Sequence, residues 1–372
     1  MRASESSLPQ LAADASCCGD APFAGSYIDV TEGTMVTPVG NVPRVPTQLK
    51  FRDTLGRWKA RWVIGRMRYR VAPGLYAVGN PTSKSLVFVS ANYKMSFDYL
   101  RSRLHGRDAW IMALDTKGIN VWCAAGKGTF GTDEIARRVS QTRLVEIVSH
   151  RQLILPQLGG PGVSAHEVKD RSGFRVVYGP IRADDLPAFL DAGLKATDDM
   201  RLVRFSTVDR LVLAPVELMM AGKYLLWVAL ALFILSGLGR DLYSFERVPT
   251  VGGPTLLLLF AAYVAGGVMT PVLLPWLPGR AFSLKGALAG LVVLVAVGLY
   301  STFGSQWSPA LWDVAAWTIL APAIASFIGM NFTGASTYTS LSGVRREMRV
   351  AVPLQIAGGV VGLALWIAAR FV

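Results

Sequence analysis

Five long apolar segments fill the chain after Gly222. Each has 17 to 24 residues and carries charges only at its ends. A helix of that length crosses a hydrocarbon core of about 30 Å. The pattern therefore predicts an all-α transmembrane domain over residues 218–372, with five spans near 223–239, 253–276, 284–303, 313–332 and 351–370.

The preceding part, residues 50–217, alternates short apolar runs with amphipathic stretches. The apolar runs predict strands at 86–90, 110–114, 144–148 and 175–178, with a closing pair at 202–205 and 210–213. Helices are expected at 95–104, 132–143 and 184–192. This order is typical of an α/β domain, Rossmann-like with a mainly parallel sheet. Residues 115–128 are then expected at the carboxyl ends of the strands, where such sheets bind ligands.

A lone cysteine lies in the segment NVWCAAGK, residues 120–127. Asn120 is a good N-cap, so Cys123 takes the third position of a short helix, where free amides and the helix dipole favour a thiolate. Lys127 lies one turn further on and acts in the same direction. Such a thiolate suits a soft metal centre or nucleophilic attack. The alternative is a buried cysteine that packs as a small apolar side chain.

Six segments, which follow one another in order along residues 50–372, match the sequence pattern of one known protein family. With its cap-helix segment DTKGINVWCAAGKGTFGTDE, the chain resembles the mercury-methylating corrinoid protein family, HgcA. The other matching segments are GLYAVGNPT, SANYK, SHRQLILPQLGGPGVSAH, VVYGP and NFTGASTYTSLSGV. The first domain is similar, more distantly, to the corrinoid domain of the corrinoid iron–sulfur protein of acetyl-CoA synthesis.

The resemblance implies a corrinoid-dependent methyltransferase. A cobalamin-type corrinoid is expected to bind base-off, with Cys123 as the lower axial ligand to cobalt, and its methyl group is expected to pass to Hg(II), forming methylmercury. The remaining corrinoid contacts that the resemblance implies are Asn92, Thr116, Asn120, Val121, Trp122, Ala124, Ala125, Gly126 and Lys127. The alternatives are a corrinoid methyl carrier of one-carbon metabolism and a non-enzymatic corrinoid-binding or transport protein.

The cysteine count bears on the redox partner. Cys17, Cys18 and Cys123 are too few and too badly spaced for an iron–sulfur cluster, a structural zinc site or a disulfide framework. A corrinoid needs a low-potential electron donor, so a separate protein has to supply it. The resemblance implies a ferredoxin-like partner with two 4Fe–4S clusters (HgcB-like), and a methyl donor that is methyltetrahydrofolate or its protein carrier. Cys17 and Cys18 lie in residues 1–49, which are predicted to be flexible.

Histidine is the main competitor for the cobalt ligand. His105, His150 and His166 are too scattered for a zinc signature, and the chain lacks the D-x-H-x-x-G corrinoid motif. Cys123 is therefore the stronger candidate. His150 and His166 are expected to be hydrogen-bonded structural residues.

The charge distribution predicts the location of the chain. The net charge is +13, and the densest basic stretch, residues 50–70, indicates either a membrane or acidic-partner contact or a solvated face. No motif supports nucleic-acid binding. The start of the chain has no signal-peptide core. Six cations flank the spans on one side and three on the other, which predicts a multi-pass inner-membrane protein with the first domain cytoplasmic and the carboxyl end outside.

Overall fold

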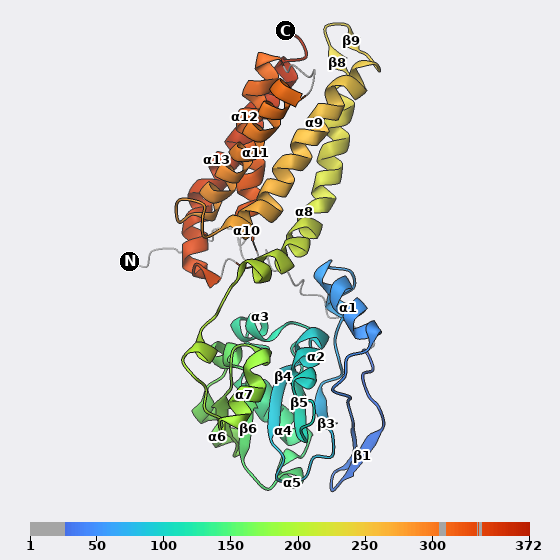
Figure 1. Cartoon of the computed structure of the whole chain (residues 1–372), viewed down its shortest axis with the longest axis vertical. Coiled ribbons are helices and arrows are strands. Elements are labelled where there is room, and N and C mark those ends of the chain that lie inside the picture. The colour runs from blue at the N-terminus through green and yellow to red at the C-terminus, as the bar shows by residue number, and fades with distance from the viewer. Residues whose placement is uncertain (1–26, 305–309, 333, 335–336) are drawn as a thin grey trace, which may run out of the picture. The chain divides into compact units, whose positions relative to one another are not determined.

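The chain folds into two compact units in a computed structural model that describes residues 27–304, 310–332, 334 and 337–372 (Figure 1). The first unit comprises Met1–Ala60 with Ile64–Val203, and the second comprises Arg61–Val63 with Arg204–Val372. Cys17 and Cys18 lie outside the described residues.

The first unit is built on a five-stranded sheet. Its strand order is β3-β5-β4-β6-β7, formed by Gly74–Val78, Ala109–Leu114, Val87–Ala91, Gln152–Leu155 and Arg175–Tyr178. Strands β5, β4, β6 and β7 pair in parallel, whereas β3 pairs antiparallel with β5 at the edge. The predicted α/β class with a mainly parallel sheet is confirmed, since four strands run parallel and only the edge strand β3 is antiparallel.

Helices cover both faces of this sheet. Helices α4 (Thr132–Gln141) and α6 (Ala165–Ser172) pack on one face, and α2 (Lys94–Ser102) and α7 (Leu186–Asp191) pack on the other. All six residues of β5 are buried and turn alternately to the two cores. A sheet covered on both faces needs such continuous apolar strands.

Three predictions about the first domain's elements are wrong. Residues 144–148, predicted as a strand, contain helix α5 (Leu144–Ile147), because its buried residues lie three apart while Val145 is exposed. The predicted strand at 210–213 belongs to a long helix, α8, that begins at Thr207, and 202–205 is not a strand. Strands β3 and β6 were not predicted.

Ordered structure also occurs within the segment that was predicted to be flexible. Strands β1 (Thr34–Thr37) and β2 (Gly40–Pro43) form an antiparallel hairpin, and Arg44 bridges to Ala77 of β3. Helix α1 (Phe51–Arg61) follows. The short helices of the first unit are η1 (Arg66–Arg68), α3 (Val121–Gly126), η2 (Gln157–Gly162), η3 (Ala183–Asp185) and η4 (Asp199–Arg201).

The second unit contains, within the described residues, five helices long and apolar enough to cross a membrane. They confirm the predicted number of spans. Their elements are α8 (Thr207–Leu235), α9 (Arg247–Val264) continued by the π-helix η5 (Ala265–Met269) and α10 (Thr270–Leu273), α11 (Phe282–Gly304), α12 (Leu311–Met330) and α13 (Leu341–Ala368). Strands β8 (Leu238–Gly239) and β9 (Leu242–Tyr243) form a small hairpin.

Helix α8 differs from its prediction in length. It begins at Thr207, 16 residues before the predicted start of the first span, because Ser206 and Asp209 form a capping box there. Glu217 and Lys223 consequently lie inside the helix rather than at its end. The last charged residue of α8 is Lys223, so its uninterrupted apolar part is Tyr224–Leu235.

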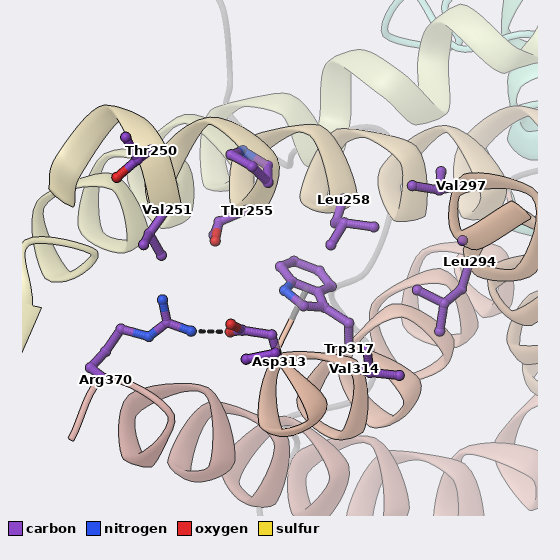
Figure 2. A pocket seen from close by; sticks show the side chains of 13 residues that line it. Thr250, Val251, Thr255, Leu258, Leu294, Val297, Asp313, Val314, Trp317 and Arg370 are labelled. Carbon is purple, nitrogen blue, oxygen red and sulfur yellow. Dashed lines mark hydrogen bonds and ion pairs between the residues drawn. The ribbon is translucent and has the colours of Figure 1, made fainter. Parts of the chain in front are cut away.

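A cavity of about 280 Å³ lies among the helices of the second unit (Figure 2). Leu258, Trp317 and Leu294 form its apolar wall, and Asp313 and Arg370 point toward each other and form an ion pair at one side. Asp313 lies in the first turn of α12 and Arg370 just after α13. These two charges therefore lie at helix ends, as predicted.

Candidate functional site

The predicted cap helix lies at the carboxyl edge of the sheet. Helix α3 follows strand β5 through residues 115–120 and packs against η2, which follows strand β6, and against strand β4 (Figure 1). Strands β5, β4 and β6 are parallel, so their carboxyl ends meet at this edge. The predicted position of residues 115–128 is thus confirmed.

The cap geometry is also as predicted. The Asn120 side chain accepts a hydrogen bond from the Cys123 amide at 2.9 Å, and the Ala124 amide donates to the Asn120 carbonyl at 2.9 Å. Cys123 is the third residue of the helix. The helix ends at Gly126, and Gly128 takes the left-handed conformation with φ of 77°, which only glycine adopts without strain.

Burial divides the residues of α3 into two sets. Val121, Ala124 and Ala125 are buried against the first unit, so they anchor the helix to the sheet. Cys123 is half-buried and contacts the edge of the core below the helix. Trp122 is also half-buried, and Gly126 and Lys127 are exposed. The sulfur of Cys123 therefore lies between an apolar floor and the surface, on a helix of one and a half turns.

Asn92 and Thr116 were both expected to contact a cofactor, and both are fully buried. Asn92 follows strand β4, and Thr116 lies in the loop before the cap. The Asn92 side-chain oxygen accepts from the Thr116 amide at 3.1 Å, the Thr116 hydroxyl at 2.9 Å and the Gly118 amide at 3.0 Å. The Thr116 hydroxyl also lies 2.7 Å from the carbonyl of Ile119. These contacts fix the path of residues 115–120, so Asn92 and Thr116 position the cap helix.

A carboxylate holds the start of the same loop. Glu134 of α4 accepts a hydrogen bond from the Asp115 amide at 2.8 Å and from Arg138 at 2.7 Å, and it also pairs with Arg137. Burial by itself would raise the pKa of Glu134, but the Asp115 amide and the two guanidinium groups outweigh it and lower the pKa. The carboxylate therefore stays ionised at neutral pH and anchors the loop to α4.

Two glycines of the LGGPG segment are required by the approach of η2 to the cap, a role that sequence analysis missed. A Cβ at Gly162 would lie 2.3 Å from the Phe130 carbonyl oxygen and 2.9 Å from Ala125 Cα. A Cβ at Gly159 would lie 2.5 Å from the Phe130 ring. The signal available in the sequence was the glycine-rich stretch after an apolar run.

A crevice opens beside this edge. It has a volume of about 100 Å³ and is lined by Ser90 of β4, Leu155 of β6, Val121 of α3 and the segment 179–183. The chain passes from β4 to β5 on one side of β4 and then crosses to β6 on its other side, so the crevice between β4 and β6 lies at the point where the strand order reverses. Ligands of open α/β sheets bind at such switch points.

The histidines do not gather at the cap. His150 precedes β6 at the amino edge of the sheet and bonds to the Ser85 carbonyl at 2.9 Å, while His105 precedes β5 and lies 3.0 Å from the Thr47 hydroxyl. His166 is exposed and lies 3.1 Å from Ser164 Oγ. The hydrogen-bonded roles expected for His150 and His166 agree with these contacts. Within the described ranges, no group of three or more His, Cys, Asp or Glu side chains could hold a metal ion.

Residues 64–190 match the family model CdhD. Its description is "CO dehydrogenase/acetyl-CoA synthase delta subunit", and the matched residues include the five-stranded sheet, α3 and η2. The gamma subunit of the acetyl-CoA decarbonylase/synthase complex of Methanopyrus kandleri is 29% identical over 123 residues, which is 32% of this chain and 26% of that subunit.

Two further gamma subunits show the same extent of similarity. That of Archaeoglobus fulgidus is 27% identical over 128 residues (34% of this chain, 27% of the subunit), and gamma 2 of Methanosarcina thermophila is 31% identical over 124 residues (32% and 25%). The chain thus spans about a quarter of the length of these relatives. The range matched by the family model, residues 64–190, contains the sheet and the cap.

Proposed function

We propose that the first unit binds a cobalamin-type corrinoid base-off, with Cys123 as the lower axial ligand to cobalt, and that the chain transfers a methyl group from cobalt to Hg(II). One observation carries this proposal. Cys123 lies on a capped one-and-a-half-turn helix at the carboxyl edge of the sheet, inside the region that matches the CdhD family model. The proposal makes the protein a methyltransferase whose product is methylmercury.

The residues of the cap fit a corrinoid. A soft sulfur donor on a short, fixed helix is suited to a transition metal of intermediate softness. Around Cys123, Trp122 is half-buried and Gly126 and Lys127 are exposed. When bound, the corrinoid would supply a methyl group carried on cobalt.

The chain's own residues orient the sulfur. Asn120 fixes the amide of Cys123, and Asn92 and Glu134 fix the loop that precedes it. The Cys123 thiolate would hold the cobalt of the corrinoid, and its electron density would suit a methyl group that leaves with its bonding electrons toward an electrophile such as Hg(II). Positioning of the sulfur is therefore the main contribution of the polar network below the cap.

The second unit serves as a membrane anchor in this proposal. The charge bias of the flanking segments supports a topology with the first unit on the cytoplasmic side of the inner membrane and the carboxyl end outside. A ferredoxin-like protein with two 4Fe–4S clusters supplies electrons, and methyltetrahydrofolate or its protein carrier supplies the methyl group. Protease added to intact spheroplasts should leave residues 64–190 intact; cleavage there would contradict this topology.

A second candidate function is a corrinoid methyl carrier with another acceptor. The observation that favours it is the similarity to subunits of the acetyl-CoA decarbonylase/synthase complex. A non-enzymatic transporter of corrinoids is less well supported, because the cavity within the second unit measures about 280 Å³, below the usual range for drug-sized ligands.

The experiment that separates the first two functions follows the methyl group. The full-length protein in nanodiscs is loaded with corrinoid and given ¹³C-methyltetrahydrofolate, a two-cluster ferredoxin and Hg(II). We expect labelled methylmercury by mass spectrometry, and none from the Cys123→Ala variant. Label that stays on the protein with Hg(II) present, and moves only when acetyl-CoA synthase is added, would favour the carrier and overturn mercury methylation.

A further inference from the structure

We propose that helix α1 (Phe51–Arg61) forms a membrane-surface element that lies flat in the headgroup region of an anionic bilayer. Phe51, Leu55 and Trp58 follow one another at helical spacings of four and three residues, so they share one face. The exposed fractions of their side chains are 79, 42 and 63%. Three large apolar side chains on one exposed face are unusual for a surface in water.

The opposite face of α1 is fixed to the first unit by buried charges. Asp53 bonds to Lys94 at 2.5 Å and to Arg101 at 2.9 Å, and these two cations of α2 are almost fully buried. Asp98 completes the network, contacting Lys94 at 2.6 Å and Arg101 at 2.8 Å. Because the network holds Asp53 inward, the apolar stripe of α1 is held outward.

Close backbone packing supports the same orientation. Ala60 is fully buried, and a Cβ at Gly56 would lie 2.6 Å from the Tyr69 ring. Gly56 therefore allows α1 to approach Tyr69 directly. Rotation of the helix to bury Trp58 would break both this contact and the ion pairs of Asp53.

The charges around the stripe select an anionic surface. Arg52, Lys59 and Arg68 are exposed, and Arg61 and Arg66 are half-exposed. The acidic residue of α1, Asp53, is neutralised by Lys94 and Arg101. A helix with tryptophan and phenylalanine on one side and cations beside them is typical of helices that bind anionic lipid surfaces.

The remainder of the chain keeps a bilayer available to α1. Five helices are long and apolar enough to span a membrane, so the lipid surface is tethered to the same polypeptide at high effective concentration. An acidic protein would match the cations, but the stripe of Phe51, Leu55 and Trp58 and the tether favour lipid. The docking does not depend on the corrinoid assignment.

Docking of α1 would orient the carboxyl edge of the sheet. Lys94 is the first residue of α2, directly after the carboxyl end of β4, so its ion pair with Asp53 places α1 at that edge. Gly118 of the loop before the cap also lies close to the segment after α1, since a Cβ there would be 3.3 Å from the Met67 carbonyl. The edge that carries Cys123 would then lie near the lipid surface.

Photo-crosslinking tests the proposal on the full-length protein. Trp58 is replaced by p-benzoylphenylalanine, and the protein is reconstituted in nanodiscs that contain phosphatidylglycerol or only phosphatidylcholine. The matched control carries the same replacement at Val36 of β1, which is 82% exposed and lies outside α1. Mass spectrometry then identifies what is attached to each position.

We expect a phospholipid adduct at position 58 and none at position 36. Its yield should fall at least fivefold when phosphatidylglycerol is absent, and about 25-fold in the Arg52→Gln, Lys59→Gln double variant, because each of the two cations contributes roughly a fivefold gain near an anionic surface. An adduct that joins position 58 to protein, no lipid adduct in anionic nanodiscs, or equal lipid yields at positions 58 and 36 would overturn the proposal. Equal yields in the two lipids would overturn the choice of an anionic surface.

Discussion

The carboxyl edge of the sheet and the helical bundle of the second unit are both tightly packed, but by different means. At the sheet edge one buried amide, that of Asn92, receives hydrogen bonds from three groups of a loop. In the bundle, small residues allow helices to touch: Cβ atoms at Gly286 and Gly290 would lie 2.5 and 2.7 Å from carbonyl oxygens of α12. Hydrogen bonds between buried polar groups fix the loop at the site, whereas small residues allow the helices of the anchor to pack closely.

The same contrast holds for charged residues. The first unit buries a network of two carboxylates and two cations whose charges cancel: Asp53, Asp98, Lys94 and Arg101. The second unit pairs Asp313 with a single cation where two helices end. Interior charges need every partner, because an ion left unpaired in a low-dielectric core is costly. We therefore expect the first unit to respond most strongly to loss of a single polar group.

The largest effect is expected for Asp98→Ala. This change leaves Lys94 and Arg101 without their fully buried partner and should reduce the free energy of unfolding of the first unit by about 3–5 kcal/mol. Pulse proteolysis of the full-length protein in urea measures the loss. The control is Asp184→Ala, whose pair with Arg103 is roughly half-exposed, with an expected loss of about 0–1 kcal/mol. Equal losses of unfolding free energy in the two variants would show that the buried ion network is no more sensitive than a half-exposed ion pair.

A second test addresses the approach of η2 to the cap. In Gly162→Ala the new Cβ would meet backbone atoms of Phe130 and Ala125, so α3 must shift. Corrinoid affinity, measured by equilibrium dialysis, should fall about tenfold, which corresponds to about 1.4 kcal/mol. Gly160→Ala is the matched control, because its Cβ would lie 3.8 Å from the nearest atom, a side-chain carbon of Tyr178. Unchanged affinity in Gly162→Ala would show that the cap does not depend on η2.

Sequence patterns predicted the anchor better than the sheet. A run of about twenty apolar residues has few alternatives to a spanning helix, so all five spans were found. Strand β6 has only four residues, and the neighbouring run at 144–148 is equally apolar, so local pattern could not separate a strand from a helical turn. Strand β3 is defined by its pairing with β5, in which Gly74 lies opposite Ala113, 39 residues further along the chain.

The site was predicted in part for the same reason. The N-cap of Asn120 is local and could be identified from the residue type and its position before the helix. The roles of Asn92 and Gly162 depend on segments that follow different strands and meet only in the folded sheet. Residue type alone indicated neither the three hydrogen bonds to the Asn92 side chain nor the lack of space for a Cβ at Gly162, which would lie 2.9 Å from Ala125 Cα.

A smaller effect is expected for the local cap. Asn120→Ala removes the acceptor of the Cys123 amide and should cost about 1 kcal/mol of helix stability. Hydrogen exchange of the Cys123 amide should accelerate roughly fivefold. Asn120→Asp retains an acceptor and should keep the slow exchange. Fast exchange in the wild-type protein would argue against a formed cap.

The smallest effect concerns acid stability. Because the folded-state pKa of Glu134 lies below its ordinary value of 4.5, the carboxylate contributes stability at pH values above 4.5, and that contribution is lost as the pH falls through the folded pKa. Glu134→Gln should therefore be less stable than the wild type at pH 7, and the difference should shrink below pH 4.5. Urea unfolding of both proteins across this range measures it, and a constant difference would contradict the role of the ionised carboxylate.

The central claim is that Cys123 binds the cobalt of a corrinoid. Cobalt K-edge X-ray absorption of the full-length protein loaded with cobalamin tests it directly, with Cys123→Ala as the comparison and Cys123→His as a variant that retains a ligand. The account predicts a sulfur neighbour of cobalt in the wild-type protein, its loss in Cys123→Ala, and its replacement by nitrogen in Cys123→His. A cobalt environment without sulfur in the wild type, or one unchanged by Cys123→Ala, would contradict the account.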